Sequence, residues 1–122
     1  MPTGTCLCGE IKIAYEGVPV WRMANTQVFQ VLKTSFSVTQ GQPKTYTKEI
    51  MNYFCATCGT TLYRTGGAER NSDKIGVRAG VLDDQSLLDN PPAIEVYVEK
   101  RPPWVKQVEG AIQLNGKYEV VS

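Results

Sequence analysis

The chain has 122 residues, a length typical of one domain, and carries 13 basic and 12 acidic side chains for a formal net charge of +1. This balance provides neither a basic surface for nucleic acid nor an attraction to anionic membranes. No apolar run approaches the roughly 20 residues that span a bilayer, and the N-terminus lacks the features of a signal peptide. We therefore expect a single domain over residues 1–122, located in the cytoplasm, without a nucleic-acid or membrane partner.

The first part of the chain predicts β-strands. Apolar and polar residues alternate over residues 10–16, which is the pattern of a half-buried strand, and a second β-rich region covers residues 27–39. Residues 20–26 lie between them and show neither a clear period nor turn residues. We therefore expect an irregular connection at 20–26.

The middle of the chain predicts a hairpin that contains a Cys-x-x-Cys sequence. A turn at residues 41–43 precedes two expected strands at 44–47 and 51–55, and a third strand is expected at 60–65 with Leu62 in the core. The polar, glycine-bearing residues 66–73 that follow predict an exposed loop.

The last part of the chain predicts further short elements. We expect a strand at 74–81, one helical turn at 83–89 with Leu87 and Leu88 facing inward, an alternating strand at 93–99 and a final strand at 117–121. In the strand at 93–99, the alternation places Ile94, Val96 and Val98 on one side and Glu95, Tyr97 and Glu99 on the other. Many short strands with almost no helix predict an all-β fold.

The four cysteines form two close pairs, and each pair is followed by a glycine. Cys6 and Cys8 lie near the N-terminus, whereas Cys55 and Cys58 lie in the middle of the chain. Four thiolates satisfy a tetrahedral Zn²⁺ completely and leave no open position for substrate. The chain has no histidine, so a zinc site here would be all sulfur. The pattern therefore predicts one structural zinc.

Three other interpretations of these cysteines remain open. A disulfide framework would need an oxidising compartment and a strained ring if it joined Cys6 to Cys8. A redox dithiol at Cys55 and Cys58 would normally lie within a βαβ pattern, which the sequence does not show. A nucleic-acid-binding zinc ribbon needs a basic surface, and only residues 99–106 mix charge with an aromatic side chain.

The order of motifs along the chain is similar to that of a known enzyme family. The motifs are Gly-Thr-Cys-Leu-Cys-Gly at 4–9, Gly-Gln-Pro-Lys-Thr-Tyr at 41–46, Phe-Cys-Ala-Thr-Cys-Gly at 54–59, Ala-Gly-Val-Leu-Asp-Asp at 79–84 and Pro-Pro-Trp-Val at 102–105. This arrangement resembles the glutathione-dependent formaldehyde-activating enzymes, also called the centromere protein V family. The resemblance implies carbon–sulfur lyase chemistry and a β-tent (Mss-four-like) fold of several short coiled antiparallel sheets. It also implies a structural zinc on Cys6, Cys8, Cys55 and Cys58.

The chain departs from this family's pattern in one place. The family carries a Cys-His-Cys-x-x-Cys motif between the first strand and the middle strands, and its cysteines bind the catalytic zinc. The corresponding residues 21–28 read Trp-Arg-Met-Ala-Asn-Thr-Gln-Val and contain neither cysteine nor histidine. The resemblance therefore implies the structural zinc but not the catalytic one.

Catalysis without that zinc would depend on polar and aromatic residues bordering the altered segment. The residues that we expect there are Trp21, Arg22, Asn25, Gln27, Tyr53, Tyr63, Arg78, Glu95 and Tyr97. The candidates for catalysis are Arg22, Tyr53, Tyr63, Arg78, Glu95 and Tyr97. Each has a structural alternative: a tyrosine can pack in a half-buried position, Arg78 can pair with Asp83 or Glu95, and Arg22 can stack on Trp21.

Three functions compete at this stage. The first is a lyase, cyclase or isomerase that acts on a small molecule through residues other than the structural zinc. The second retains the family's glutathione-adduct carbon–sulfur lyase chemistry. The third is a zinc-containing binding module without catalysis. A small-molecule substrate is the expected partner, and the sequence leaves pairing into a homodimer open.

Overall fold

The computed structural model describes the whole chain apart from residues 20, 25–27, 67–72, 117–118 and 121–122. For residues 21–24 and 119–120 only the backbone is described. None of the helices in these ranges has the length and apolar character needed to cross a membrane. The predicted exposed loop at 66–73, the connection at 20–26 and the strand at 117–121 therefore lie partly outside the described residues, and Asn25 and Gln27 lie wholly outside them.

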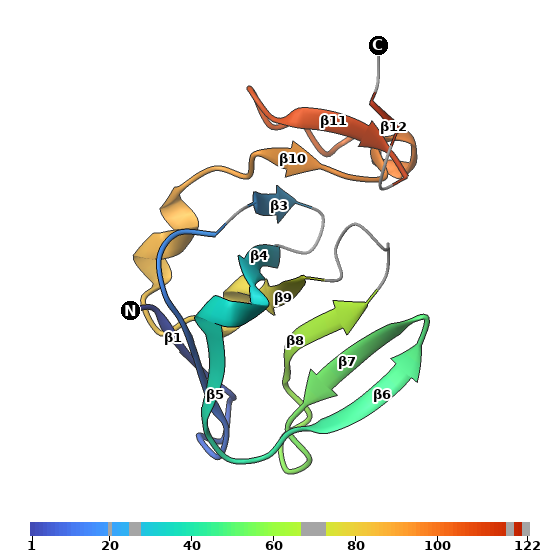
Figure 1. The fold of residues 1–122 in the computed structure, drawn as a ribbon. Coiled ribbons are helices and arrows are strands. Elements are labelled where there is room, and N and C mark those ends of the chain that lie inside the picture. Colours follow the sequence, from blue (N-terminus) through green and yellow to red (C-terminus); the bar gives the residue numbers. More distant parts are fainter. Residues whose placement is uncertain (20, 25–27, 67–72, 117–118, 121–122) are drawn as a thin grey trace.

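A three-stranded antiparallel sheet forms one side of the molecule (Figure 1). Its order is β1 (Thr3–Thr5), β2 (Lys12–Tyr15) and β5 (Phe36–Gln40). In the central strand, Ile13 pairs with Gly4 on one side and with Val38 on the other. Gly4 also bridges to Leu82, which joins this sheet to the chain that follows β9.

A second, larger sheet contains the other described strands, in the order β12-β11-β10-β3-β4-β9-β8-β7-β6. Its neighbouring strands are antiparallel except around β10, which is parallel to both β3 and β11. The bounds are β3 (Trp21–Ala24), β4 (Val28–Leu32), β6 (Lys44–Lys48), β7 (Ile50–Phe54), β8 (Thr61–Gly66), β9 (Lys74–Arg78), β10 (Ile94–Glu95), β11 (Ile112–Asn115) and β12 (Glu119–Val120).

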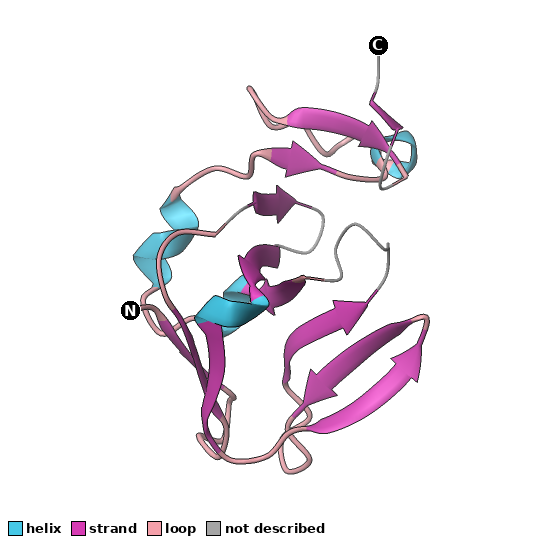
Figure 2. Cartoon of the chain, viewed as in Figure 1, coloured by secondary structure: helices cyan, strands magenta, loops and turns pink. Residues whose placement is uncertain are grey.

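The expected all-β fold is confirmed, since the described helices are all short 3-10 turns (Figure 2). They are η1 (Lys33–Ser35), η3 (Ala79–Val81), η4 (Gln85–Asp89) and η5 (Val98–Lys100). The turn expected at 83–89 corresponds to η4, which begins after Asp84, whose side chain accepts the backbone N–H of Ser86. Leu87 and Leu88 pack against the core from η4, as predicted.

The prediction of an irregular connection at 20–26 is wrong for its described part, because Trp21–Ala24 forms strand β3. Its backbone pairs with β4 on one side and with β10 on the other. Pairing on both sides stabilises a strand regardless of side-chain period. A period-two search therefore does not detect it.

The strand predicted at 93–99 is also mostly wrong, because β10 ends at Glu95. Tyr97 has a positive φ of 54°, and its N–H donates to the Gly116 carbonyl at 2.7 Å. This left-handed residue turns the chain into η5. Glu95 is buried, and its carboxylate contacts Arg101, Val108 and Gln113 from the segment that follows. The sequence pattern did not predict β11. It predicted one strand in this region, at 117–121, and the described β12 lies within those bounds.

The hydrophobic core lies between the two sheets and also includes two of the cysteines. Leu62 is fully buried, as predicted, and Cys6 and Cys55 are buried in the same cluster. The other members are Ile11, Ile13, Tyr15, Phe29, Val31, Tyr63, Ile75, Val77, Ala79 and Leu82. The core is therefore continuous with the cysteine turns.

Replacing Leu62 with alanine should lower the free energy of unfolding by about 2 to 5 kcal/mol, because the change removes buried apolar area and leaves a cavity. Urea unfolding of the purified protein measures this loss. Leu32→Ala is the matched control, since Leu32 is 41% exposed and its truncation should change the stability much less. Equal losses in the two variants would contradict the assignment of the core.

Candidate functional site

Two short turns, each closed by the N–H of a glycine, present the four cysteines. In the first, the N–H of Gly9 donates to the Cys6 carbonyl at 3.0 Å; in the second, the N–H of Gly59 donates to the Cys55 carbonyl at 2.8 Å. Both glycines have a positive φ, 83° and 78°, which glycine adopts without steric penalty. The glycine after each cysteine pair therefore lets the chain curl back around the sulfur atoms.

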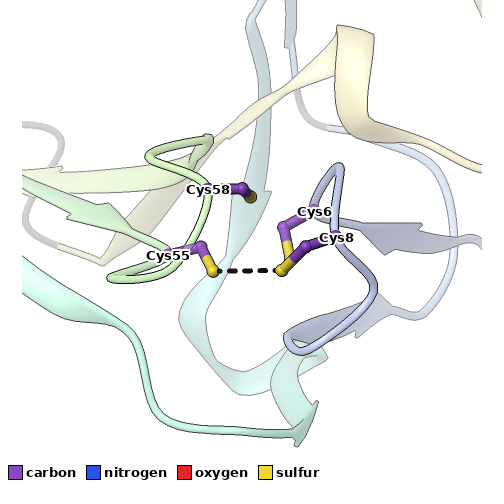
Figure 3. A group of neighbouring side chains, drawn as sticks. All are labelled: Cys6, Cys8, Cys55 and Cys58. Atoms are coloured by element: carbon purple, nitrogen blue, oxygen red, sulfur yellow. Dashed lines mark hydrogen bonds between the residues drawn. The ribbon is translucent and has the colours of Figure 1, made fainter.

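The two turns bring all four sulfur atoms together (Figure 3). The Sγ atoms lie within 4.8 Å of one another, and Cys8 Sγ is 3.6 Å from both Cys6 Sγ and Cys55 Sγ. Four sulfurs placed at about 2.3 Å around a tetrahedral zinc would be about 3.8 Å apart. The cluster therefore fits one Zn²⁺, and among the described residues no Asp or Glu joins it.

Hydrogen bonds connect the two turns directly and stabilise their sulfur atoms. The N–H of Leu7 donates to the Thr60 hydroxyl at 3.2 Å, and the Thr57 hydroxyl donates to Glu10 at 2.6 Å. The Thr60 hydroxyl lies 3.1 Å from Cys58 Sγ. These contacts hold the turns against each other independently of a metal.

The sulfur atoms do not ionise alike. Hydrogen bonds from the Thr60 side chain and backbone lower the pKa of Cys58 to about 5. A backbone hydrogen bond at Glu10 favours the Cys8 thiolate, but burial and the neighbouring sulfurs of Cys55, Cys6 and Cys58 outweigh it and raise the pKa of Cys8 to about 12. Four thiolates at this distance repel one another, so a divalent cation would be needed to stabilise all of them.

Tyr53 and Tyr63 serve packing. Their rings stack with centroids 4.3 Å apart and an interplanar angle of 12°, and Phe36 packs against Tyr63 at 4.6 Å. Tyr63 is 6% exposed and belongs to the core. Burial, followed by the neighbouring Tyr53, raises the pKa of Tyr63 to about 12. The packing alternative therefore describes Tyr63 better than a catalytic role.

Glu95 holds the C-terminal segment in place. Its Oε2 atom accepts hydrogen bonds from Arg101 Nη2 at 3.0 Å, from the Val108 N–H at 3.1 Å and from Gln113 Nε2 at 2.7 Å. Arg101 also donates to the Gln113 side-chain oxygen. Three donors on one buried oxygen leave this carboxylate little freedom to act as a general base.

Arg78 does not take the carboxylate partners suggested by the sequence. Glu95 pairs with Arg101, and Asp83 accepts a hydrogen bond from the Thr3 hydroxyl at 2.7 Å. Arg78 is half-buried at the end of β9. The sequence did not predict either Arg101 or Gln113 near Glu95, because their contacts depend on the fold of residues 98–111.

A cavity of about 660 Å³ adjoins Glu95 and Tyr97. Its described lining lies within residues 95–108 and includes the cations Lys100, Arg101 and Lys106. Lys100 Nζ lies 5.6 Å from the centre of the Tyr97 ring. Among the catalytic candidates whose side chains are described, Tyr97 alone lines this cavity without taking part in the Glu95 hydrogen bonds or the tyrosine stack.

The other candidates lie on or beside β3. Arg22 pairs through its backbone with Phe29 and Trp21 with Gln30; their side chains, like Asn25 and Gln27, lie outside the described part of the structure. The structure therefore does not test the stacking of Arg22 on Trp21.

Comparison with known proteins identifies the family. The profile described as glutathione-dependent formaldehyde-activating enzyme matches residues 1–100. A crystal structure of a Rhodobacter sphaeroides protein, solved as a structural-genomics target, is similar in fold with a TM-score of 0.57 and 20% identity, over 70% of this chain and 94% of that chain. The comparison with curated proteins found no match.

Replacing Cys55 with serine should release the metal and destabilise the fold, because it removes one ligand from a site whose binding energy supports folding. We expect one zinc per wild-type chain by elemental analysis, and a clear loss of both zinc and thermal stability in Cys55→Ser. Thr57→Ala, a change in the same turn outside the sulfur set, should retain the zinc. A wild-type ratio near zero or two would contradict a single structural site.

The raised pKa of Tyr63 predicts a loss of stability at high pH. An unfolded tyrosine ionises near pH 10, whereas Tyr63 in the fold ionises near 12. The stabilising contribution is therefore complete below about pH 10 and is lost as the pH rises towards 12. Urea unfolding between these pH values should show this loss in the wild type and in Tyr46→Phe, an exposed control. It should be reduced in Tyr63→Phe; an unchanged pH dependence there would refute the assignment.

Proposed function

The chain belongs to the glutathione-dependent formaldehyde-activating enzyme family, and we propose that it is a zinc-stapled lyase-type enzyme whose catalysis does not use that zinc. The observation that carries the proposal is the gathering of all four cysteines into one all-sulfur cluster. Such a site is closed, because four thiolates fill the tetrahedral positions of the ion. Zinc bound there would supply a cross-link between the two turns.

The proposed chemistry is a proton-transfer reaction on one small organic molecule. Lyases, cyclases and isomerases can move a proton and a bonding pair within a single substrate, so they need no added oxidant or reductant. The cavity beside Tyr97 is large enough for a small molecule. The phenol hydroxyl of Tyr97 can donate or accept a hydrogen bond there. We therefore assign proton transfer to Tyr97.

A second candidate is favoured by the family match. The family's name describes activation of formaldehyde with glutathione, so the chain would in that case retain carbon–sulfur lyase chemistry on a glutathione adduct. We rank it second because residues 21–28 contain no cysteine or histidine that could hold a further zinc. A small-molecule partner stays a proposal in both cases, and pairing into a homodimer stays the open alternative that the sequence left.

An untargeted turnover assay tests the proposal. The zinc-loaded protein is incubated with a metabolite extract of the source cells, and substrate and product masses are followed by mass spectrometry. We expect one compound to fall while a product of equal mass, or of the mass left after elimination, rises. Tyr97→Phe should reduce the rate at least tenfold, whereas Trp104→Ala, at a position 83% exposed, should not.

A parallel incubation with formaldehyde and glutathione separates the two candidates. Faster adduct formation than in buffer, equal in wild type and Tyr97→Phe, would favour the second candidate. An absence of wild-type turnover in both incubations would overturn the assignment as an enzyme and leave a binding module.

A further inference from the structure

The strands β4, β9 and β8 carry an apolar row on one face and a polar row on the other. Phe29, Val77 and Tyr63 are register partners across the three strands and all lie in the core. The neighbouring row on the opposite face pairs Gln30 with Gly76 and Gly76 with Arg64. Successive residues of a strand point to opposite faces, so this polar row lies on the face opposite Phe29, Val77 and Tyr63, which it shares with the buried Val28.

Arg64 and Arg78 are neighbours on this polar face. Arg64 pairs directly with Gly76, and Arg78 lies two residues further along β9. Diagonal positions of this kind are about 7 to 8 Å apart between backbones, within reach of long side chains. Both arginines are half-buried, so neither side chain extends freely into water.

Gly76 allows the Arg64 side chain to lie across β9. A Cβ atom built on Gly76 would be 3.4 Å from Arg64 Cγ and 3.6 Å from Arg64 Nε, and only 3.0 Å from the Val28 side chain. The stem of Arg64 therefore lies at van der Waals distance from position 76, and the Val28 side chain leaves the least room there. Gly76 is the register partner of Arg64 and lies two residues before Arg78, so no side chain at position 76 stands between the two arginines.

The two guanidinium groups are like charges that lack a described counter-charge. Burial, and then the charge of Arg78, lower the pKa of Arg64, while Tyr97 acts in the opposite direction. Among the described residues the ion pairs are Lys74 with Asp73 and Arg101 with Glu95. Two half-buried cations without a carboxylate between them repel each other, and an anion placed between them would convert this repulsion into attraction.

We propose that Arg64 and Arg78 bind a carboxylate group of the substrate. Planar guanidinium groups match a carboxylate in bidentate geometry. The identification of the ligand as a substrate rests on the proposed function. The anion site itself is tested by binding alone. The same geometry accepts phosphate, so the experiment must separate the two oxyanions.

Binding is measured first, without turnover. Succinate and inorganic phosphate are titrated separately into the zinc-loaded protein at low ionic strength, with the arginine Nε–H signals followed by nuclear magnetic resonance. We expect saturable succinate binding that shifts the signals of Arg64 and Arg78. Arg64→Gln and Arg78→Gln should each weaken it at least tenfold, and Arg64→Lys should fall between Arg64→Gln and wild type.

The control variant is Lys48→Gln, which makes the same charge change on the exposed strand β6. It should bind succinate as the wild type does. Equal binding by Arg64→Gln and Lys48→Gln would overturn the site. Binding of phosphate without succinate would overturn the carboxylate assignment.

Stability separates a ligand site from a structural role. Without ligand, Arg64→Gln should unfold at the same or a higher urea concentration than wild type, because it removes a repulsive charge. A lower midpoint would indicate a structural partner for Arg64 and refute the proposal. If succinate binds as expected but no turnover is found, the proposed function fails while the anion site stands.

Discussion

The whole structure depends on one constraint, which is that four sulfur atoms from two distant turns occupy a single small volume. The first turn joins β1 to β2 in the smaller sheet, and the second joins β7 to β8 in the larger one. A metal on these sulfurs would therefore fasten the two sheets together. Because Cys6 and Cys55 are also buried in the core, the same cluster fixes the apolar packing between the sheets.

This use of the cysteines determines where chemistry can take place. With every thiol in the cluster and no histidine in the chain, proton transfer must depend on other groups. The structure restricts two of the candidates further: Tyr63 is enclosed by aromatic rings, and Glu95 already accepts three hydrogen bonds. Among the described side chains, the hydroxyl of Tyr97 and the guanidinium groups of Arg78 and Arg64 are neither enclosed by aromatic rings nor saturated with hydrogen bonds.

The sequence predicts the hairpins well, because their information is local. The Cys55 turn, its flanking strands and buried Leu62 follow from alternation and turn residues in one short stretch. Strand β3 does not, because its pairing with β10 depends on a segment far along the chain. The burial of Glu95 has the same origin. The contact of Arg64 with β9 follows only from the register that pairs it with Gly76. A glycine within a predicted strand does indicate that another group approaches the backbone closely, but it does not say which group.

The position of two arginines on one face has an energetic consequence for the fold as a whole. Half-buried like charges without a described counter-charge oppose folding, and a small domain has little stability to spare. The sulfur cluster can offset this, because metal binding to folded ligands adds directly to the free energy of folding. Functional sites commonly keep such unfavourable arrangements when another part of the structure stabilises them. The cysteine cluster and the arginine face are thus complementary: the first stabilises a fold in which the second can remain unpaired until a ligand binds.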